Sequence, residues 1–294
     1  MRVSTSQFYR VNSDQMRLAQ SNVSELQAKI GSGRQMTHAS EDPGKANLIS
    51  RLESAKERQA TYSKNVDAAE TRLSAEEAVL ESMTSIMQRV TQLTIQGGSD
   101  TMSPEDRKVI AIEIEALRNE LLKLSNTQDL GGNYIFSGNK TGEPAFVQNV
   151  SGVVSYNGDY GRLEINVSDV RKVSVNTLGP ELFSTADFAT LDDLVTKLRA
   201  NNGTGIRSAQ TSLNTITDTL INSYGAMAGR VAAIESQRSV IEETELRIDE
   251  LLIREDDLDY ATAVTDLTKE TLALQALQAS FAKVTQLSLF NYIR

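Results

Sequence analysis

The sequence predicts a mainly α-helical protein with a small β insertion, in which long helices pair as a nested, antiparallel coiled-coil bundle. Apolar residues repeat every seven positions, or alternately every three and four, along most of the 294 residues. One stretch in the middle of the chain instead alternates with a period of two, which is typical of strands. The chain contains 4 Pro and 5% aromatic residues, a composition that favours long helices over loops and thick cores.

The two ends of the chain carry matching apolar stripes. The N-terminal stripe runs from Tyr9 to Ile30 in steps of seven and stops at Gly31–Gly33. The C-terminal stripe continues the same spacing from Ile253 to Val284. Both stripes are narrow, so each helix needs a partner helix rather than a globular core. We expect the two helices to pair and to need further cover from neighbouring molecules, which would make folding and assembly one event.

This expectation defines a terminal coiled-coil assembly domain, residues 1–35 plus 258–294. Its predicted assembly interface consists of the apolar residues of both stripes, namely Tyr9, Met16, Val23, Leu26, Ile30, Tyr260, Leu267, Leu274, Leu277, Phe281 and Val284. Between the first helix and the next, Pro43 prevents a continuous helix and Ser40 or Asp42 is suited to cap a new one. We therefore predict an ordered loop at Asp42 and Pro43.

A helical rod domain, residues 36–131 plus 184–257, follows inside the terminal helices. Its first seam runs from Leu48 to Val90 with two polar interruptions, Gln59 and Glu76. Gly97 ends that helix, and Ser103 begins the next as a cap. A returning helix repeats every seven residues from Leu213 to Ile248. Within it, Gly225 and Gly229 predict a close approach between helices.

The β insertion is predicted at residues 132–183. Residues 153–156 and 162–167 alternate in polarity and flank the turn Asn157–Gly161. This arrangement predicts a small antiparallel unit that is closed by Asn-Gly turn chemistry, with residues 173–175 following in the same period.

Composition and motifs argue against several function classes. A net charge of −9 without a concentrated basic face does not suit a nucleic-acid partner, and 0 Cys removes thiolate metal sites and cysteine nucleophiles. No stretch reaches the roughly 18 to 20 apolar residues of a membrane span, and the polar N-terminus lacks a signal-peptide core. His38 is the single His, for which loop hydrogen bonding is the default role. We expect no enzyme activity, no cofactor and no metal.

Several short segments then resemble one known family, and they occur in the same order around matching heptads. They are Arg2–Ser6, Ser32–Arg34 with Ala39–Pro43, Gly131–Gly138 with Thr141, Pro144 and Phe146, Tyr156–Asp159, Gly179–Phe183 and Leu287–Tyr292. The resemblance covers nearly the whole chain and is to the flagellin-like proteins of the bacterial hook–filament junction. The small insertion favours these junction proteins over flagellin itself.

The resemblance implies a structural protein of the bacterial flagellum. A ring of copies would join the hook, through the first hook-associated protein, to the flagellin filament, and the terminal segments would line its inner tube. Members of this family are exported unfolded by the flagellar type III apparatus after binding an export chaperone at the C-terminal region. The implied location is therefore the secreted flagellum at the hook–filament junction.

Three alternatives are weighed at this point. A minor flagellin that forms filament itself would share the same terminal stripes. A coiled-coil signalling protein would belong to a different class, but it would need a membrane span or a receiver contact that the sequence does not show. An enzyme would need a hydrolytic activity that depends on His38.

Overall fold

The structure, a computed structural model, describes residues 2–290 of the chain and the side chains of residues 7–285. Residues 1 and 291–294 of the predicted terminal domain, and with them the end of the segment Leu287–Tyr292, lie outside the described residues. The chain divides into two compact units, the first made of residues 1–58 and 243–294 and the second of residues 59–242.

The described elements are mostly long helices, as the sequence predicted. The helices are α1 (Arg2–Ser32), α2 (Pro43–Gly97), α3 (Pro104–Leu124), α4 (Gly179–Leu182), α5 (Thr185–Arg199), α6 (Gly203–Asp256) and α7 (Tyr260–Phe290). The strands are β1 (Phe146–Gln148), β2 (Val154–Tyr156), β3 (Glu164–Asn166) and β4 (Lys172–Ser174). The predicted class, mainly α with a small β insertion, is confirmed.

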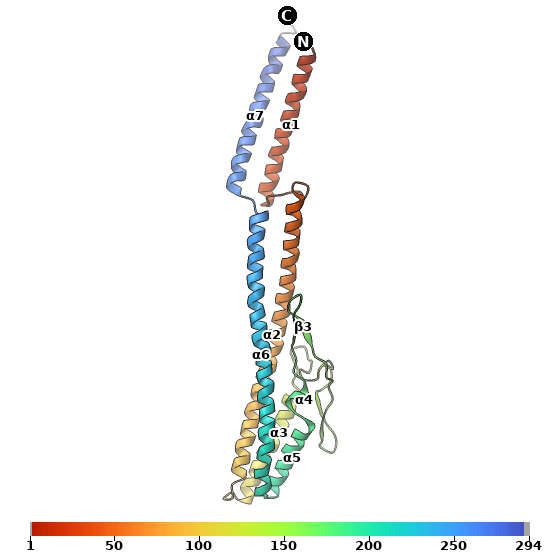
Figure 1. Ribbon diagram of the computed structural model, residues 1–294, viewed down its shortest axis with the longest axis vertical. Coiled ribbons are helices and arrows are strands. Elements are labelled where there is room, and N and C mark those ends of the chain that lie inside the picture. The colour runs from red at the N-terminus through yellow and green to blue at the C-terminus, as the bar shows by residue number, and fades with distance from the viewer. Residues whose placement is uncertain (1, 291–294) are drawn as a thin grey trace. The chain divides into compact units, whose positions relative to one another are not determined.

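In the first unit, α1 and α7 lie side by side and run in opposite directions, with both described chain ends at the same end of the pair (Figure 1). Their shared core is small. Ala19, Val23 and Leu274 are buried, and Leu267 and Leu277 pack against them. The sparse core follows from the sequence, since each helix offers one narrow stripe to its partner.

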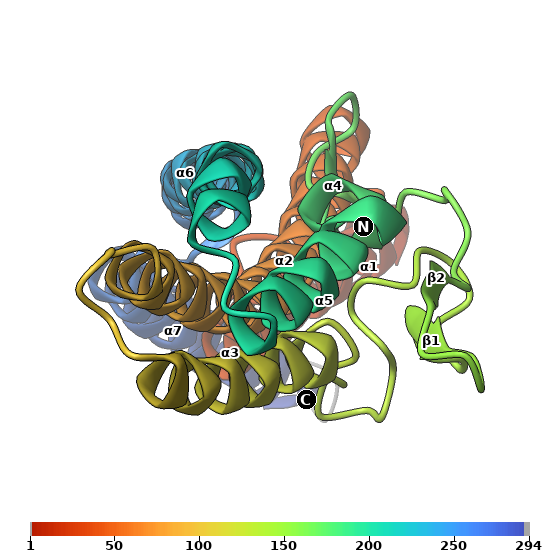
Figure 2. The same ribbon diagram turned by 90° about the horizontal axis from the view of Figure 1, so that it is seen from below.

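The core of the second unit is enclosed by more helices than the core of the α1 and α7 pair. Viewed along its helices, α2, α3, α5 and α6 group around a common apolar interior (Figure 2). Leu80, Met83 and Met87 of α2 are completely buried in it, as is Phe188 of α5. The predicted start of α3 is confirmed, because the Asp106 amide donates to the Ser103 hydroxyl oxygen at 3.2 Å.

The β insertion differs from its predicted form. β2 pairs with β1, and β3 pairs with β4, giving two separate two-stranded antiparallel sheets. The prediction that the segments around Asn157–Gly161 form one hairpin is therefore wrong. That turn is held by local bonds instead, since the Tyr156 hydroxyl donates to the Asp159 carbonyl oxygen at 2.6 Å. Each strand is only 3 residues long, so a period of two cannot identify its partner.

A second expectation is also wrong. Gly225 and Gly229 are exposed, and a side chain at either position would meet no atom within 4 Å. They do not mark a close approach between helices. The close approach lies at Gly97, where a Cβ atom would come within 2.7 Å of the Leu198 side chain.

Candidate assembly interface

The predicted interface residues on α1 and α7 fall into three groups by exposure. Val23 and Leu274 are buried between the two helices, and Tyr260 and Val284 are 53% and 37% exposed. The remaining predicted residues are half-buried: Tyr9, Met16, Leu26, Ile30, Leu267, Leu277 and Phe281. The structure therefore brings most of the two stripes together and leaves part of each uncovered.

The sequence reasoning missed further exposed apolar side chains on the same two helices. These are Phe8, Val11 and Leu18 on α1, and Val264 and Leu272 on α7. Val11 and Leu18 stand seven residues apart, so their heptad spacing was a readable signal of a second stripe. Exposed apolar surface that is spaced along a helix is typical of a surface that binds another helix.

A hollow of about 290 Å³ opens between α1 and α7. Its lining includes the apolar side chains of Met16, Leu274 and Phe281 and the polar ones of Ser13 and Gln278. The ring of Phe281 meets the ring of Tyr9 edge to face, with centroids 5.6 Å apart. Apolar side chains of both helices line the hollow, and a hollow of this kind can receive a side chain from a neighbouring helix.

The predicted loop between α1 and α2 is built around two carboxylates. Asp42 caps α2, because its Oδ1 accepts a hydrogen bond from the Lys45 amide at 2.9 Å, and Pro43 opens the helix. Glu41 accepts from the Thr37 and His38 amides, each at 2.9 Å. His38 itself has an exposed side chain and contributes its backbone.

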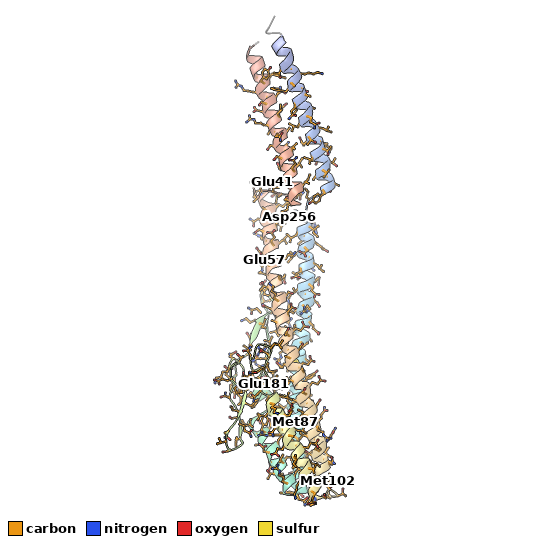
Figure 3. All side chains as sticks on the ribbon, turned by 180° about the vertical axis from the view of Figure 1, so that it is seen from behind. Glu41, Glu57, Met87, Met102, Glu181 and Asp256 are labelled. Carbon is orange, nitrogen blue, oxygen red and sulfur yellow. The ribbon has the colours of Figure 1, made fainter. Side chains whose placement is uncertain are left out.

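Glu41 is also held by a charge. The Lys29 ammonium lies 2.7 Å from its carboxylate, and this hydrogen bond, with the two amide donors, lowers the pKa of Glu41 to about 2. Figure 3 labels Glu41, which lies between α1 and α2, and Asp256, which is the last residue of α6. The loop is thus fastened to α1 through a carboxylate that stays ionised at neutral pH.

The two connections in this unit are paired with each other, and we call residues 33–35 and 256–258 the crossing. The Gln35 amide donates to the Asp256 carbonyl oxygen at 2.6 Å, and the Leu258 amide donates to the Gly33 carbonyl oxygen at 3.0 Å. Arg34 Nε lies 3.0 and 2.8 Å from the two carboxylate oxygens of Asp256. No local pattern in the sequence predicts this contact between residues 222 positions apart.

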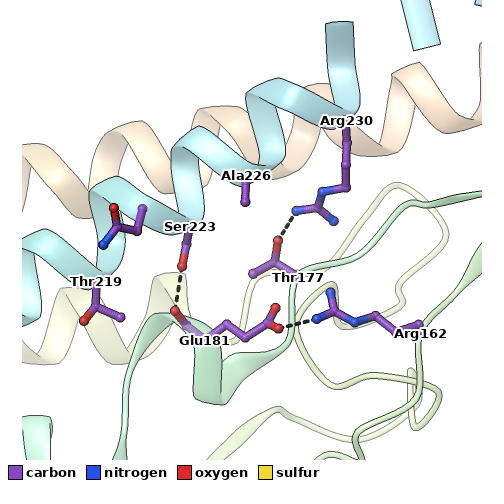
Figure 4. A pocket seen from close by; sticks show the side chains of 8 residues that line it. Arg162, Thr177, Glu181, Thr219, Ser223, Ala226 and Arg230 are labelled. Atoms are coloured by element: carbon purple, nitrogen blue, oxygen red, sulfur yellow. Dashed lines mark hydrogen bonds and ion pairs between the residues drawn. The ribbon is translucent and has the colours of Figure 1, made fainter. Parts of the chain in front are cut away.

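A polar pocket of about 620 Å³ lies in the second unit, between α6 and the chain that leaves the insertion (Figure 4). Its Arg162 is paired with Glu181, and Arg230 lies 3.1 Å from the carboxylate of Glu76. The Ser223 hydroxyl donates to the Glu181 carbonyl oxygen at 2.6 Å. Because these charged groups already pair within the chain, the pocket fastens the insertion to the helices rather than presenting free reactive groups.

Glu76 is the buried centre of that arrangement, with 1% of its surface exposed. It accepts hydrogen bonds from the amide and the hydroxyl of Thr177 as well as from Arg230. Burial raises the pKa of Glu76, and the positive charge of Arg230 opposes that rise. The residue that interrupted the predicted seam is therefore a polar link between α2, α6 and the insertion.

Within residues 2–290, no helix is long and apolar enough to cross a bilayer. Across the part of the chain that the structure describes, His, Asp and Glu side chains nowhere gather in threes in a way that could hold a metal ion.

Comparison with known proteins agrees with this arrangement. Residues 3–141 match the bacterial flagellin N-terminal helical region. The chain is 24% identical to flagellar hook-associated protein 3 of Salmonella typhimurium over 100% of both chains, and 25% identical to the same protein of Escherichia coli over 99% of both. The chain is therefore similar over its full length to flagellar hook-associated protein 3, and residues 3–141 share the helical region of flagellins. A flagellin of Bacillus subtilis is 23% identical over 88% of both chains, which fits a family that includes flagellins.

Solved structures from the family share this fold. A flagellar hook-associated protein of Vibrio parahaemolyticus superposes with a TM-score of 0.67 at 19% identity, and covers 73% of this chain and 98% of its own. FlgL of Xanthomonas campestris superposes with a TM-score of 0.61 at 20% identity, covering 69% of this chain and 99% of its own. The chain therefore shares its helical fold with these two structures over about 70% of its length.

Proposed function

We propose that this chain is a structural adapter of the bacterial flagellum that joins the hook to the flagellin filament. The observation that carries the proposal is likeness over the full length, insertion included, to hook-associated protein 3 of two bacteria. The flagellin likeness is weaker and covers less of the chain. The exposed apolar side chains on α1 and α7 supply the surface that such an adapter needs.

In this proposal the α1 and α7 pair is the element that assembles. Copies form a ring, the first hook-associated protein lies on the hook side, and flagellin lies on the filament side. Residues 1–35 with 258–294 act as the assembly domain, residues 36–131 with 184–257 as the helical rod domain, and residues 132–183 as the insertion. The protein has no catalytic role, which agrees with charged pocket residues that pair with each other.

The route to the flagellum is part of the proposal. The chain is secreted unfolded through the flagellar type III apparatus, and an export chaperone binds its C-terminal region beforehand. The exposed apolar residues of α7, Val264 and Leu272 among them, provide a surface that a chaperone would cover before assembly. The predicted interface residues Tyr260, Leu274 and Phe281 lie on the same helix.

Truncation tests the role of the terminal pair. Removal of residues 271–294 is expected to abolish incorporation into flagella and to leave the second unit folded, because its core is closed by its own helices. Motility and electron microscopy measure incorporation, and circular dichroism with proteolysis measures the fold. A motile strain, or a collapse of the helical signal beyond the deleted helix and its α1 partner, would contradict the proposal.

A point substitution tests the interface more sharply. Phe281→Asp is expected to block incorporation with little change in the melting temperature of the monomer, because the ring lies at an open hollow. Val284→Asp serves as a second variant, because Val284 is a predicted interface residue of the same helix and is 37% exposed. Val170→Asp is the matched control, since Val170 is an exposed apolar residue of the second unit. Equal losses of melting temperature and of assembly would show that the stripe is an internal core instead.

The alternative function is a minor flagellin, which the likeness to a Bacillus subtilis flagellin favours. Purified chain added to isolated hooks separates the two. An adapter stops after a short zone of fixed length, whereas a flagellin continues to grow as long as protein is supplied. Continued growth would replace the adapter proposal by the flagellin one.

A further inference from the structure

We infer that Arg34 is a positioning residue that sets the register in which α1 and α7 pair. The inference concerns the pair of helices that the proposed function assigns to assembly, and its consequence for incorporation rests on that function. The observation behind it is the crossing, where the connection from α1 to α2 is bonded to the connection from α6 to α7.

The α1 and α7 stripes do not specify their own register strongly. Their common core has three buried side chains, and one of these is an alanine. Both stripes repeat every seven residues, so a slip by one heptad brings apolar positions opposite apolar positions again. Such a slip displaces one helix along the other by about 10 Å at a rise of 1.5 Å per residue. Apolar packing alone therefore leaves the slipped pairing close in free energy.

The crossing supplies the directional bonds that the stripes lack. Two backbone hydrogen bonds, from Gln35 to Asp256 and from Leu258 to Gly33, fix which residue of one connection faces which residue of the other. Arg34 then fastens the pair, because its guanidinium contacts both carboxylate oxygens of Asp256 and lies 3.2 Å from Glu53 of α2. The Nε–H is shared between the two oxygens of Asp256 while Nη2 donates to Glu53, so the planar guanidinium holds two carboxylates in fixed directions, which a point charge does not do.

The first residue of α7 also contacts the crossing. Gly33 has a φ of +72°, which favours glycine, and a Cβ atom there would lie 2.8 Å from the hydroxyl oxygen of Tyr260. Tyr260 is the first residue of α7. The turn that ends α1 is thus in contact with the residue that begins α7.

The register set at the crossing reaches the far end of the helices. Tyr9 stands 24 residues before Gly33, and Phe281 stands 23 residues after Leu258, as their numbers give. These two rings meet with centroids 5.6 Å apart. Nearly equal numbers of residues on the two sides of the crossing therefore bring the rings together, and a slip by one heptad would separate them.

The test measures the distance between two spin labels in the full chain. Asn22→Cys on α1 and Lys283→Cys on α7 are suitable because both positions are exposed and the chain has 0 Cys of its own. In the observed register the labelled positions are separated along the helices by 14 residues, or about 21 Å. A slip by one heptad changes that separation by about 10 Å.

Three variants weaken the crossing in different ways. Arg34→Gln and Asp256→Asn each remove one side of the ion pair, and Leu258→Pro removes the amide that donates to Gly33. Lys56→Gln is the matched control, because it breaks an exposed ion pair of 2.6 Å with Asp249 between α2 and α6 in the same unit. Distances are measured for the purified chain and for the chain incorporated into flagella after dilution with unlabelled protein.

A single distance is expected for the unmodified chain and for Lys56→Gln. Arg34→Gln, Asp256→Asn and Leu258→Pro are expected to show a second distance, displaced by about 10 Å, and a several-fold lower incorporation. The double variant Arg34→Gln with Asp256→Asn is expected to be no worse than Arg34→Gln alone, because Arg34→Gln already removes the contacts with both Asp256 and Glu53.

Two results would overturn the inference. One is a single unchanged distance in all three crossing variants, and the other is a second distance of equal weight in Lys56→Gln. A crossing variant that shows the second distance and still incorporates normally would keep the register role and contradict the proposed function of the pair in assembly.

Discussion

The second unit and the α1 and α7 pair are made from the same heptad pattern and reach different degrees of burial. In the second unit Leu80, Met83 and Met87 are completely buried, whereas Leu274, the deepest interface residue of α7, keeps 9% of its surface exposed. The difference lies in the number of helices around each stripe. Four helices enclose the apolar residues of the second unit, whereas only α1 and α7 share the apolar residues of the terminal pair. A heptad pattern therefore predicts that a helix has partners, and the local architecture decides whether those partners belong to the same molecule.

The largest expected effect tests this contrast in burial. Leu80→Ala removes a completely buried side chain and is expected to lower the free energy of unfolding by about 2 to 5 kcal/mol. Leu274→Ala is expected to change the same quantity much less, because its side chain borders an open hollow. Urea unfolding followed by circular dichroism measures both. Equal losses would show that the α1 and α7 pair has a core as closed as that of the second unit.

The buried carboxylate of the second unit gives a prediction about pH. The pKa of Glu76 is raised above its ordinary value of 4.5, so the folded state binds a proton more readily than the unfolded state. Its contribution to stability is present below that pH and is lost as the pH rises through the folded pKa. We expect the unmodified chain to lose stability relative to Glu76→Gln as the pH rises from about 4 toward neutrality. Parallel pH curves from urea unfolding would contradict this.

Glu41 in the first unit is expected to respond in the opposite direction. Its pKa is lowered from 4.5 to about 2, so its contribution is present above 4.5 and is lost as the pH falls through 2. Hydrogen exchange of the Thr37 and His38 amides, corrected for intrinsic rates, should therefore accelerate as the pH falls across that window. Glu41→Gln should remove the pH dependence. An identical pH dependence in both chains would show that ionisation of the Glu41 carboxylate does not hold the loop.

The smallest expected effect comes from an exposed ion pair on α6. Arg247→Ala removes a contact of 2.7 Å with Glu243 one turn away, and both side chains are largely exposed. The free energy of unfolding should change by at most about 0.5 kcal/mol. A larger change, seen in urea unfolding, would mean that this face of α6 is covered in a way that the exposure of its side chains does not indicate.

The helices could be predicted from the sequence because their signals are local. Ser103 and Pro104 mark the start of α3 by residue type, and Gly97 marks the end of α2. The strand pairs could not be predicted in the same way. The partner of β2 is β1, which begins at Phe146 and precedes β2, whereas the predicted turn Asn157–Gly161 follows it. A strand of three residues is too short for its alternation of polarity to identify its partner.

The candidate site shows the same division. The apolar stripes of α1 and α7 were visible as spacing, and most of their residues do meet in the structure. The roles of Arg34 and Glu76 were not visible, because their partners Asp256 and Thr177 are distant in the sequence. Glu76 was interpreted as a polar interruption of the α2 seam. The spacing of residues along α2 shows which side chains share a face of that helix, but it does not show that Arg230 of α6 lies beside Glu76.

The contact between Tyr9 and Phe281 also has a consequence for the order of folding. The two rings stand 272 positions apart in the chain, so their meeting closes nearly the whole polypeptide into one loop. Contacts of such high sequence separation form late, whereas α2 and α3 meet across a turn of a few residues. We therefore expect the helices of the second unit to form first and the α1 and α7 pair to form last. In this order the terminal pair, to which the proposed function assigns assembly, is the last part of the chain to become ordered.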